Sequence, residues 1–537
     1  MIVALAHTLP AWALVPVVAP TVAATAAAAL CGRTVVAPSA WRLARVASAA
    51  MGVAALVLVV IRVTNGAQAN EFVRIDTVTV TMMCLIAIVG WVVIRYSAVY
   101  MTGDADQRRY VQRLLVTLAA VLLVVVANNL LVLVAAWTAA SVALHGLLTF
   151  FGDRPVAIAV AHKKYLLARC ADACMLGAVV AFGTTFDTLR IDAIGADAIA
   201  AGSLPAGARI GILLVAVAAL LKCAQLPFHG WLIQVMEAPT PVSALLHAGV
   251  VNLGGFVLLR FAPVVDRAVE TRALLVVVGS LTAVIAALVM TTRVSVKVAL
   301  AWSTCAQMGF MLMQCGLGLW DMALLHLLAH SVYKAHAFLG AGGTVRQTQR
   351  NQLAVEQGTP HVRSVMVGVS AALVATAAIG VAWQSLPFTK ELSVTVWLML
   401  GIVALALVPL LTPFRAGGHV GFVLRSIGVP AVYLVIHELA ARLIPVGVAA
   451  PAGLLVFAGL SFAALFVVQS LCTIAPTGAL AQRIRPWIYA GLFLDDAFTR
   501  VAFAAFPPPP PTDRPNPLPQ PTAVAVVRVS APAATLR

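Results

Sequence analysis

Long, continuous runs of apolar residues recur along the entire chain, separated by short polar or charged segments. The runs fall near residues 10–31, 46–63, 75–95, 113–127, 129–150, 164–183, 209–227, 241–262, 272–291, 297–318, 321–343, 364–386, 393–412, 422–442 and 449–473. Runs of about 18 residues or more cross a hydrocarbon core of about 30 Å as helices. Continuous rather than alternating apolar stretches argue against a β-barrel. The pattern predicts an all-α polytopic membrane protein with about 14–15 transmembrane helices.

Composition and charge agree with this prediction. Of the 537 residues, 62% are hydrophobic and 10% are charged, and the mean hydropathy is +1.00, whereas a soluble domain has roughly 25% charged residues. The formal net charge is +16, and the basic residues cluster between apolar runs, which is typical of cytoplasmic loops. The basic loops after the first, third and fifth runs are expected to be cytoplasmic, with the N-terminus outside; they contain Arg33, Arg42, Arg45, Arg95, Arg108, Arg109, Arg113, Arg154, Lys163 and Lys164.

Two of the apolar runs are interrupted in the same way. Residues 221–229 read LKCAQLPFH and residues 385–391 read SLPFTKE. Proline removes a backbone hydrogen bond and disfavours helix at the preceding residue, so each site is expected to split a helix in two; a simple kink is the alternative. The two Leu-Pro-Phe segments lie 160 residues, or five runs, apart, and this odd number predicts two inverted five-helix repeats.

These breaks suggest a division of the chain into five parts. We expect N-terminal helices over 1–112, a first repeat over 113–262, a second repeat over 263–415, C-terminal helices over 416–503 and a Pro-rich, disordered tail over 504–537.

The lysines of the chain occur at unusual places. There are only six among the 35 basic residues, and four of them, Lys222, Lys297, Lys334 and Lys390, lie within apolar runs or at their breaks. A buried lysine can release its proton, whereas a guanidinium cannot. These four positions therefore indicate proton exchange, with snorkelling to the membrane interface as the alternative.

Histidines and carboxylates extend this candidate relay. His326, His330 and Lys334 follow a spacing of four residues and are expected to lie on one helix face. Zinc binding by the two histidines is a rival interpretation, but no nearby Cys or Glu completes a zinc shell. The first break is flanked by His229, Glu237 and His247.

A buried lysine needs a counter-ion. We expect Glu237 to pair with Lys222, with Asp172 as the alternative. Glu391, which follows Lys390, is also a relay candidate.

Four segments together resemble a known family. Residues 222–232, 236–247, 297–311 and 326–335 are similar to the antiporter-like, proton-translocating subunits of respiratory complex I and of multisubunit Na+/H+ antiporters. The resemblance implies two inverted five-helix repeats with Lys222, Lys297, Lys334 and Lys390 on a central hydrophilic axis.

Further features narrow the resemblance. The fifth run carries Trp137-Thr138 where complex I relatives have Trp-Glu, and LPFTKE and the late Trp487 to Asp496 segment resemble the DabB family. DabB proteins are membrane subunits of DabA–DabB inorganic-carbon pumps. The resemblance implies a cation-translocating subunit, with protons as the expected ion, in the bacterial inner membrane. It would energise or gate the vectorial hydration of CO2 to bicarbonate by a soluble, zinc-containing DabA-like partner on the cytoplasmic face.

The chemistry itself is expected in that partner. The chain shows no Cys/His/Cys pattern for a hydratase zinc, so we expect no enzyme activity and no cofactor in this subunit. Two alternatives stay open: an H+ or Na+ translocating subunit of a complex I-like or multisubunit antiporter complex, and a structural membrane anchor with a vestigial relay.

Overall fold

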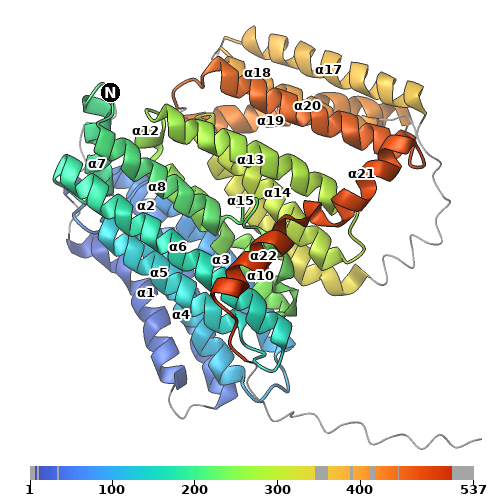
Figure 1. Ribbon diagram of the computed structural model, residues 1–537. Coiled ribbons are helices and arrows are strands. Elements are labelled where there is room, and N and C mark those ends of the chain that lie inside the picture. The colour runs from blue at the N-terminus through green and yellow to red at the C-terminus, as the bar shows by residue number, and fades with distance from the viewer. Residues whose placement is uncertain are drawn as a thin grey trace, which may run out of the picture.

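The fold is a bundle of long helices, as the apolar runs predict. The computed structural model describes residues 7–8, 11–32, 36–344, 361–387, 391–411, 418–444 and 447–510. Figure 1 shows α1 to α6 gathered on one side, α17 to α20 on the other and α13 to α15 between them. The all-α prediction is confirmed. The described strands form one small sheet in the order β1-β2-β3, with two residues each: His7–Thr8, Gln68–Ala69 and Arg74–Ile75.

The helices of the first half reach residue 265. They are α1 Ala11–Gly32, α2 Ala37–Asn65, α3 Thr77–Tyr100, α4 Gln107–Val126, α5 Leu130–Leu148, α6 Pro155–Phe186, α7 Ile191–Ala200, α8 Ala206–Lys222, α9 Gly230–Gln234, α10 Thr240–Ala248, α11 Leu253–Arg260 and α12 Ala262–Val265. Side chains start two of the long helices, because Asp76 accepts a hydrogen bond from the Thr79 amide and Asn129 accepts from Leu131.

The second half continues from residue 269. Its helices are α13 Val269–Met290, α14 Val296–Gly316, α15 Trp320–Leu339, α17 Val362–Gln384, α18 Val394–Leu411, α19 Gly418–Leu443, α20 Ala452–Ile474, α21 Ala479–Tyr489 and α22 Leu494–Ala505. Helices α13 and α14 approach so closely that a Cβ atom at Gly279 would lie 2.6 Å from the Gly309 carbonyl oxygen. Only glycine at both positions allows this contact.

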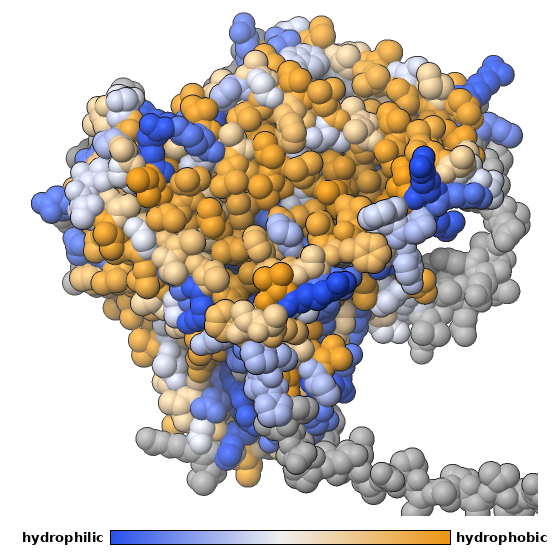
Figure 2. All heavy atoms as spheres, in the orientation of Figure 1, coloured by the Kyte–Doolittle hydropathy of each residue, from blue (hydrophilic) through white to orange (hydrophobic). Residues whose placement is uncertain are grey.

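Thirteen helices in the described ranges are long and apolar enough to cross a membrane. The other two expected spans are also helical. They are α8, with 17 residues, and α15, which carries polar residues along its length. Figure 2 shows a broad hydrophobic surface over α6, α8 and α13, with hydrophilic side chains below it. The chain is therefore a multi-pass membrane protein.

The helices are interrupted at both predicted places. Helix α8 ends at Lys222, Ala224 adopts a left-handed conformation with φ of 52°, and α9 begins only at Gly230. At the second site α17 ends at Gln384 and α18 begins at Val394. A further interruption, which was not predicted, separates α10 from α11 through the short 3-10 turn η2, Val250–Asn252. The inverted relationship of the two repeats stays a prediction.

Candidate ion-translocation site

Lys222 lies at the centre of the first break. Only 4% of this residue is exposed, and the Nζ atom has no hydrogen-bond partner among the described residues. It lies 4.3 Å from the ring centroid of Trp137 on α5, which gives a cation–π contact. A buried ammonium held mainly by an aromatic face is poorly satisfied. Lys222 can therefore respond to a neighbouring charge.

Asp172 on α6 is a buried carboxylate near enough to attract the Lys222 ammonium. The residue is 7% exposed, and its Oδ2 atom lies 2.7 Å from a guanidinium nitrogen of Arg169. The Thr138 side chain on α5 also approaches this carboxylate. Asp172 thus lies beside Thr138, which follows Trp137 on α5.

Glu237 does not pair with Lys222, so our first choice of counter-ion was wrong. Its carboxylate lies 2.9 Å from Arg154, and 43% of the Glu237 side chain is exposed. The 3-10 turn η1, Val235–Glu237, ends at this residue and leaves it on the surface beside the start of α6. Proximity in sequence was a poor guide because the chain turns away after the break.

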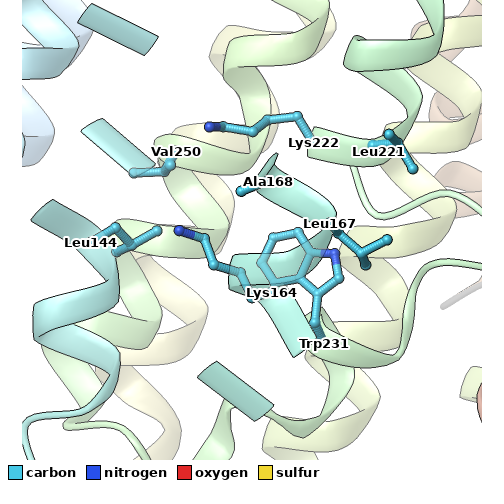
Figure 3. Close-up of a pocket in the computed structure, with 8 residues that line it drawn as sticks. All are labelled: Leu144, Lys164, Leu167, Ala168, Leu221, Lys222, Trp231 and Val250. Carbon is cyan, nitrogen blue, oxygen red and sulfur yellow. The ribbon is translucent and has the colours of Figure 1, made fainter. Parts of the chain in front are cut away.

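Lys164 is a second buried lysine at the same place. Its Nζ atom donates hydrogen bonds of 2.7 Å to the carbonyl oxygen and 3.0 Å to the hydroxyl of Ser141. Lys164 and Lys222 line a cavity of about 10 Å³, close to the smallest space that holds one water molecule. In Figure 3 both lysine side chains extend toward Val250.

The assignment of Lys163 and Lys164 to a cytoplasmic loop is wrong. Helix α6 begins at Pro155, where proline is favoured as a first helical residue. Both lysines therefore lie inside the helix and are buried, with 1% and 4% of the residues exposed. They were not predicted as buried residues because the apolar run begins only at residue 164, whereas the helix starts at Pro155.

A second polar cluster lies between α10, α14 and α15. The Nδ1 atom of His247 lies 3.1 Å from the Thr304 hydroxyl, and its ring stacks on Phe338 with centroids 4.3 Å apart. Lys334 donates hydrogen bonds of 2.7 Å to the Ser303 hydroxyl and 3.2 Å to the Leu300 carbonyl oxygen. His247 and Lys334 thus face the same stretch of α14.

The polar cluster continues along α15, where His326, His330 and Lys334 form a row with a spacing of four residues. The Nδ1 atom of His326 lies 3.0 Å from the Gln314 side chain of α14, so both ends of the row contact that helix. The rings of His326 and His330 have centroids 6.3 Å apart. Neither ring nitrogen of His330 has a hydrogen-bond partner among the described residues. The arrangement agrees with the expected shared helix face.

The remaining candidates are spread around these clusters. His229 is 1% exposed, and its ring lies 4.8 Å from that of Trp302. Lys297 is half-buried at the start of α14 and donates a 2.9 Å hydrogen bond to the Thr240 hydroxyl. Glu391 is exposed, and Lys390 lies outside the described residues.

One close contact between a buried acid and a histidine was not predicted. Asp321, near the start of α15, lies 2.6 Å from the Nδ1 atom of His437 on α19. An acidic residue in an apolar run was the available signal, but its partner is over 100 residues away. Within the described part of the chain, no group of three His, Cys, Asp or Glu residues is placed to hold a metal ion.

Two protein families match this chain over most of the helical region. The family described as NADH:quinone oxidoreductase/Mrp antiporter matches residues 127–415, and the N-terminal family of complex I chain 5 matches residues 64–111. A solved structure of the Mrp complex from Dietzia has a similar fold, with a TM-score of 0.62 at 23% identity. It covers 91% of this chain and 59% of that chain.

Named relatives show to which subfamily of these membrane subunits the chain belongs. The probable inorganic carbon transporter subunit DabB of Hydrogenovibrio crunogenus is 38% identical over 450 residues, or 82% of this chain and 85% of the relative. DabB2 of Halothiobacillus neapolitanus is 43% identical over 270 residues, half of this chain and 49% of the relative. Subunit L of the NADH-quinone oxidoreductase of Mycobacterium tuberculosis is 32% identical over 296 residues, 54% of this chain and 46% of the relative. The chain therefore belongs to the complex I and Mrp antiporter-like membrane subunits and, within them, to the DabB inorganic carbon transporter subunits.

Proposed function

We propose that this subunit translocates protons through its buried lysine and histidine clusters and thereby energises inorganic carbon uptake. The carbon chemistry, the hydration of CO2 to bicarbonate, takes place in a soluble zinc-containing partner of the DabA type on the cytoplasmic face. The complex resides in the bacterial inner membrane. The DabB relatives support the link to inorganic carbon.

The observation that carries the proposal is the environment of Lys222. Its ammonium is buried at a helix break, contacts the Trp137 ring and is attracted by Asp172 without a direct hydrogen bond among the described residues. A purely structural lysine would be expected to have its donors satisfied. A loosely held charge beside a carboxylate can instead change its protonation or its partner.

The decisive experiment measures ion flux in proteoliposomes that contain the protein with its co-purified partners. Lys222→Met keeps the length of the side chain but removes the titratable group, so imposed proton gradients should no longer drive flux. Lys222→Arg keeps the charge without proton exchange and should fail nearly as badly. Wild-type flux in Lys222→Arg would exclude proton exchange at this position.

The partner is tested separately. Tagged protein is purified in mild detergent and every co-purifying chain is analysed for zinc. We expect a soluble zinc-bearing chain with CO2 hydration activity to accompany the subunit. A zinc-bearing subunit that hydrates CO2 alone would contradict the proposal.

A second function is favoured by the relatives outside the DabB branch. The matches to NADH-quinone oxidoreductase subunit L and to the Mrp complex fold agree with an H+ or Na+ translocating subunit of such an assembly. Co-purification of complex I or antiporter subunits in the same experiment would favour this alternative.

A further inference from the structure

The C-terminal helices form an arm that crosses the molecule. We call residues 479–505, which comprise α21, the short turn η4 (Gly491–Phe493) and α22, the C-terminal arm. In Figure 1 this red segment runs from the end of α20 across the front of the bundle toward α6. Neither helix of the arm is among the membrane-crossing helices of the described residues.

The first part of the arm is attached to the second half of the protein. Arg293, just after α13, donates hydrogen bonds to the carbonyl oxygens of Ile488 at 3.3 Å and Tyr489 at 2.7 Å. Ile488 is buried in a small apolar cluster together with Trp302 of α14. Trp302 in turn contacts His229, so this attachment adjoins the first break.

The second part of the arm is attached to the first half by an ion pair. Lys163 of α6 lies 3.0 and 3.1 Å from the two carboxylate oxygens of Asp495. Gln234 of α9 donates a 2.7 Å hydrogen bond to the same carboxylate and accepts one of 3.1 Å from Lys163. Only 1% of the Lys163 side chain and 18% of the Asp495 side chain is exposed. A pair buried to this extent is costly to break.

The contact is tight enough to require a glycine. A Cβ atom at Gly230, the first residue of α9, would overlap the Asp495 carboxylate. Even the smallest side chain there would expel the carboxylate. The rings of Phe228 and Phe498 pack edge to face beside this contact, with centroids 5.3 Å apart.

The ion pair joins segments that carry the candidate ion site. Lys163 precedes Lys164 on α6, and α9 directly follows the break that contains the buried Lys222 and His229. His229 is the residue directly before Gly230, whose backbone lies against the Asp495 carboxylate. Loss of Asp495 would leave the Lys163 ammonium buried and unpaired next to this site.

We propose that the C-terminal arm is a clasp on the first helix break and that Asp495 is the positioning residue through which it controls the site of Lys164 and Lys222. This inference rests on the proposed function. With the clasp closed, the charge of Lys163 is neutralised and α9 is held against α6. With the clasp open, an added positive charge opposes the entry of a cation.

The experiment uses the full-length protein with its co-purified partners and two independent ways to open the clasp. Asp495→Asn removes the charge, and Gly230→Ala displaces the carboxylate without changing any charged group. Asp496→Asn, at the exposed neighbouring carboxylate, and Gly52→Ala, at a glycine with no atom within 4 Å of its added Cβ, are the matched controls.

Arm release is measured by trypsin cleavage after the exposed Arg500. Loss of charge-assisted hydrogen bonds shifts the closed-to-open equilibrium by about tenfold or more. We expect cleavage to be faster by this factor in Asp495→Asn and Gly230→Ala and unchanged in both controls. Unchanged cleavage in both variants would overturn the clasp.

Ion flux in proteoliposomes then tests control of the site. The cation concentration for half-maximal flux should rise several-fold in both clasp variants, because the unpaired Lys163 repels the entering cation. The double variant Lys163→Met with Asp495→Asn removes both charges and should return this concentration toward the wild-type value. A merely structural role predicts a lower maximal rate and no such rescue.

The outcomes separate this inference from the proposed function. Faster cleavage with unchanged flux would overturn control by the arm and leave the translocation function intact. Absence of flux in the wild-type complex would overturn the proposed function, and the gating role with it.

Discussion

At the scale of single residues, the structure differs most from the sequence prediction in the carboxylate that lies near Lys222. The residue type predicts correctly which titratable side chains are buried, since Lys222, His247, His330 and Lys334 all are. It does not predict which side chains pair, because a counter-ion is determined by distance in space. Asp172 lies 50 positions before Lys222, and only the packing of α5, α6 and α8 shows their relation.

The choice between the two carboxylates is directly testable. We expect Asp172→Asn to reduce flux by about tenfold or more, since it removes the charge that attracts the buried Lys222. Glu237→Gln disrupts only the exposed pair with Arg154 and should change flux less than about twofold. Ion flux is measured for both variants in proteoliposomes. A larger loss of flux in Glu237→Gln than in Asp172→Asn would support Glu237 as the counter-ion.

At the scale of helices, the sequence was most informative where apolar runs or prolines mark an element. All fifteen expected runs are helical, and a helix ends shortly before each Leu-Pro-Phe segment. The interruption at η2 was not predictable, because Val250 and Val251 have no breaking residue beside them except Gly249. The arm was also missed, since α21 and α22 are too polar to appear as apolar runs.

Helix α3 provides a stability prediction. Arg260 of α11 donates hydrogen bonds of 3.0 and 2.9 Å to Asp76, which caps α3. Burial by itself raises the pKa of Asp76, but Arg260, Arg74 and hydrogen bonds from Thr79 outweigh it and hold the pKa well below its usual range. Asp76→Asn leaves Arg260 buried without its partner and should destabilise the protein by about 3 kcal/mol.

The same carboxylate gives a pH dependence. A group whose folded-state pKa is lowered adds stability above its unfolded pKa of about 3.9, and this stability is lost as the pH falls toward the folded value. Thermal unfolding of wild-type protein in detergent should therefore become more acid-sensitive below about pH 4 than that of Asp76→Asn. An equal change of melting temperature with pH in the two proteins would show that Asp76 does not contribute to the acid sensitivity.

The contact between α13 and α14 gives a second stability prediction. Gly309→Ala places a methyl group 2.6 Å from the Gly279 carbonyl oxygen. The clash is with backbone, so the two helices have to move apart to relieve it. We expect a loss of about 1–3 kcal/mol or more. Gly401→Ala on α18, which meets no atom within 4 Å, is the control and should be neutral or stabilising. Thermal unfolding in the same detergent compares the two.

At the scale of the whole molecule, two polar clusters lie within one apolar bundle. One contains Lys164, Asp172 and Lys222, and the other contains His247, His330 and Lys334. Sequence patterns identify every member of these clusters except Lys164, but not their grouping, which depends on how the helices pack. The C-terminal arm adds a link between the two halves, through Arg293 on one side and Lys163 on the other.

The small cavity between Lys164 and Lys222 has a consequence for ion selection. Its volume of about 10 Å³ leaves space for at most one water molecule, and its walls are aliphatic apart from Trp231 and the two lysines. A proton needs only a single hydrogen-bonded bridge to pass such a constriction, whereas Na+ must keep or replace a shell of oxygen ligands. In this conformation we expect the gap to act as a size filter. Proton flux should then show a marked slowing in D2O, while sodium should fail to compete until the helices on either side separate.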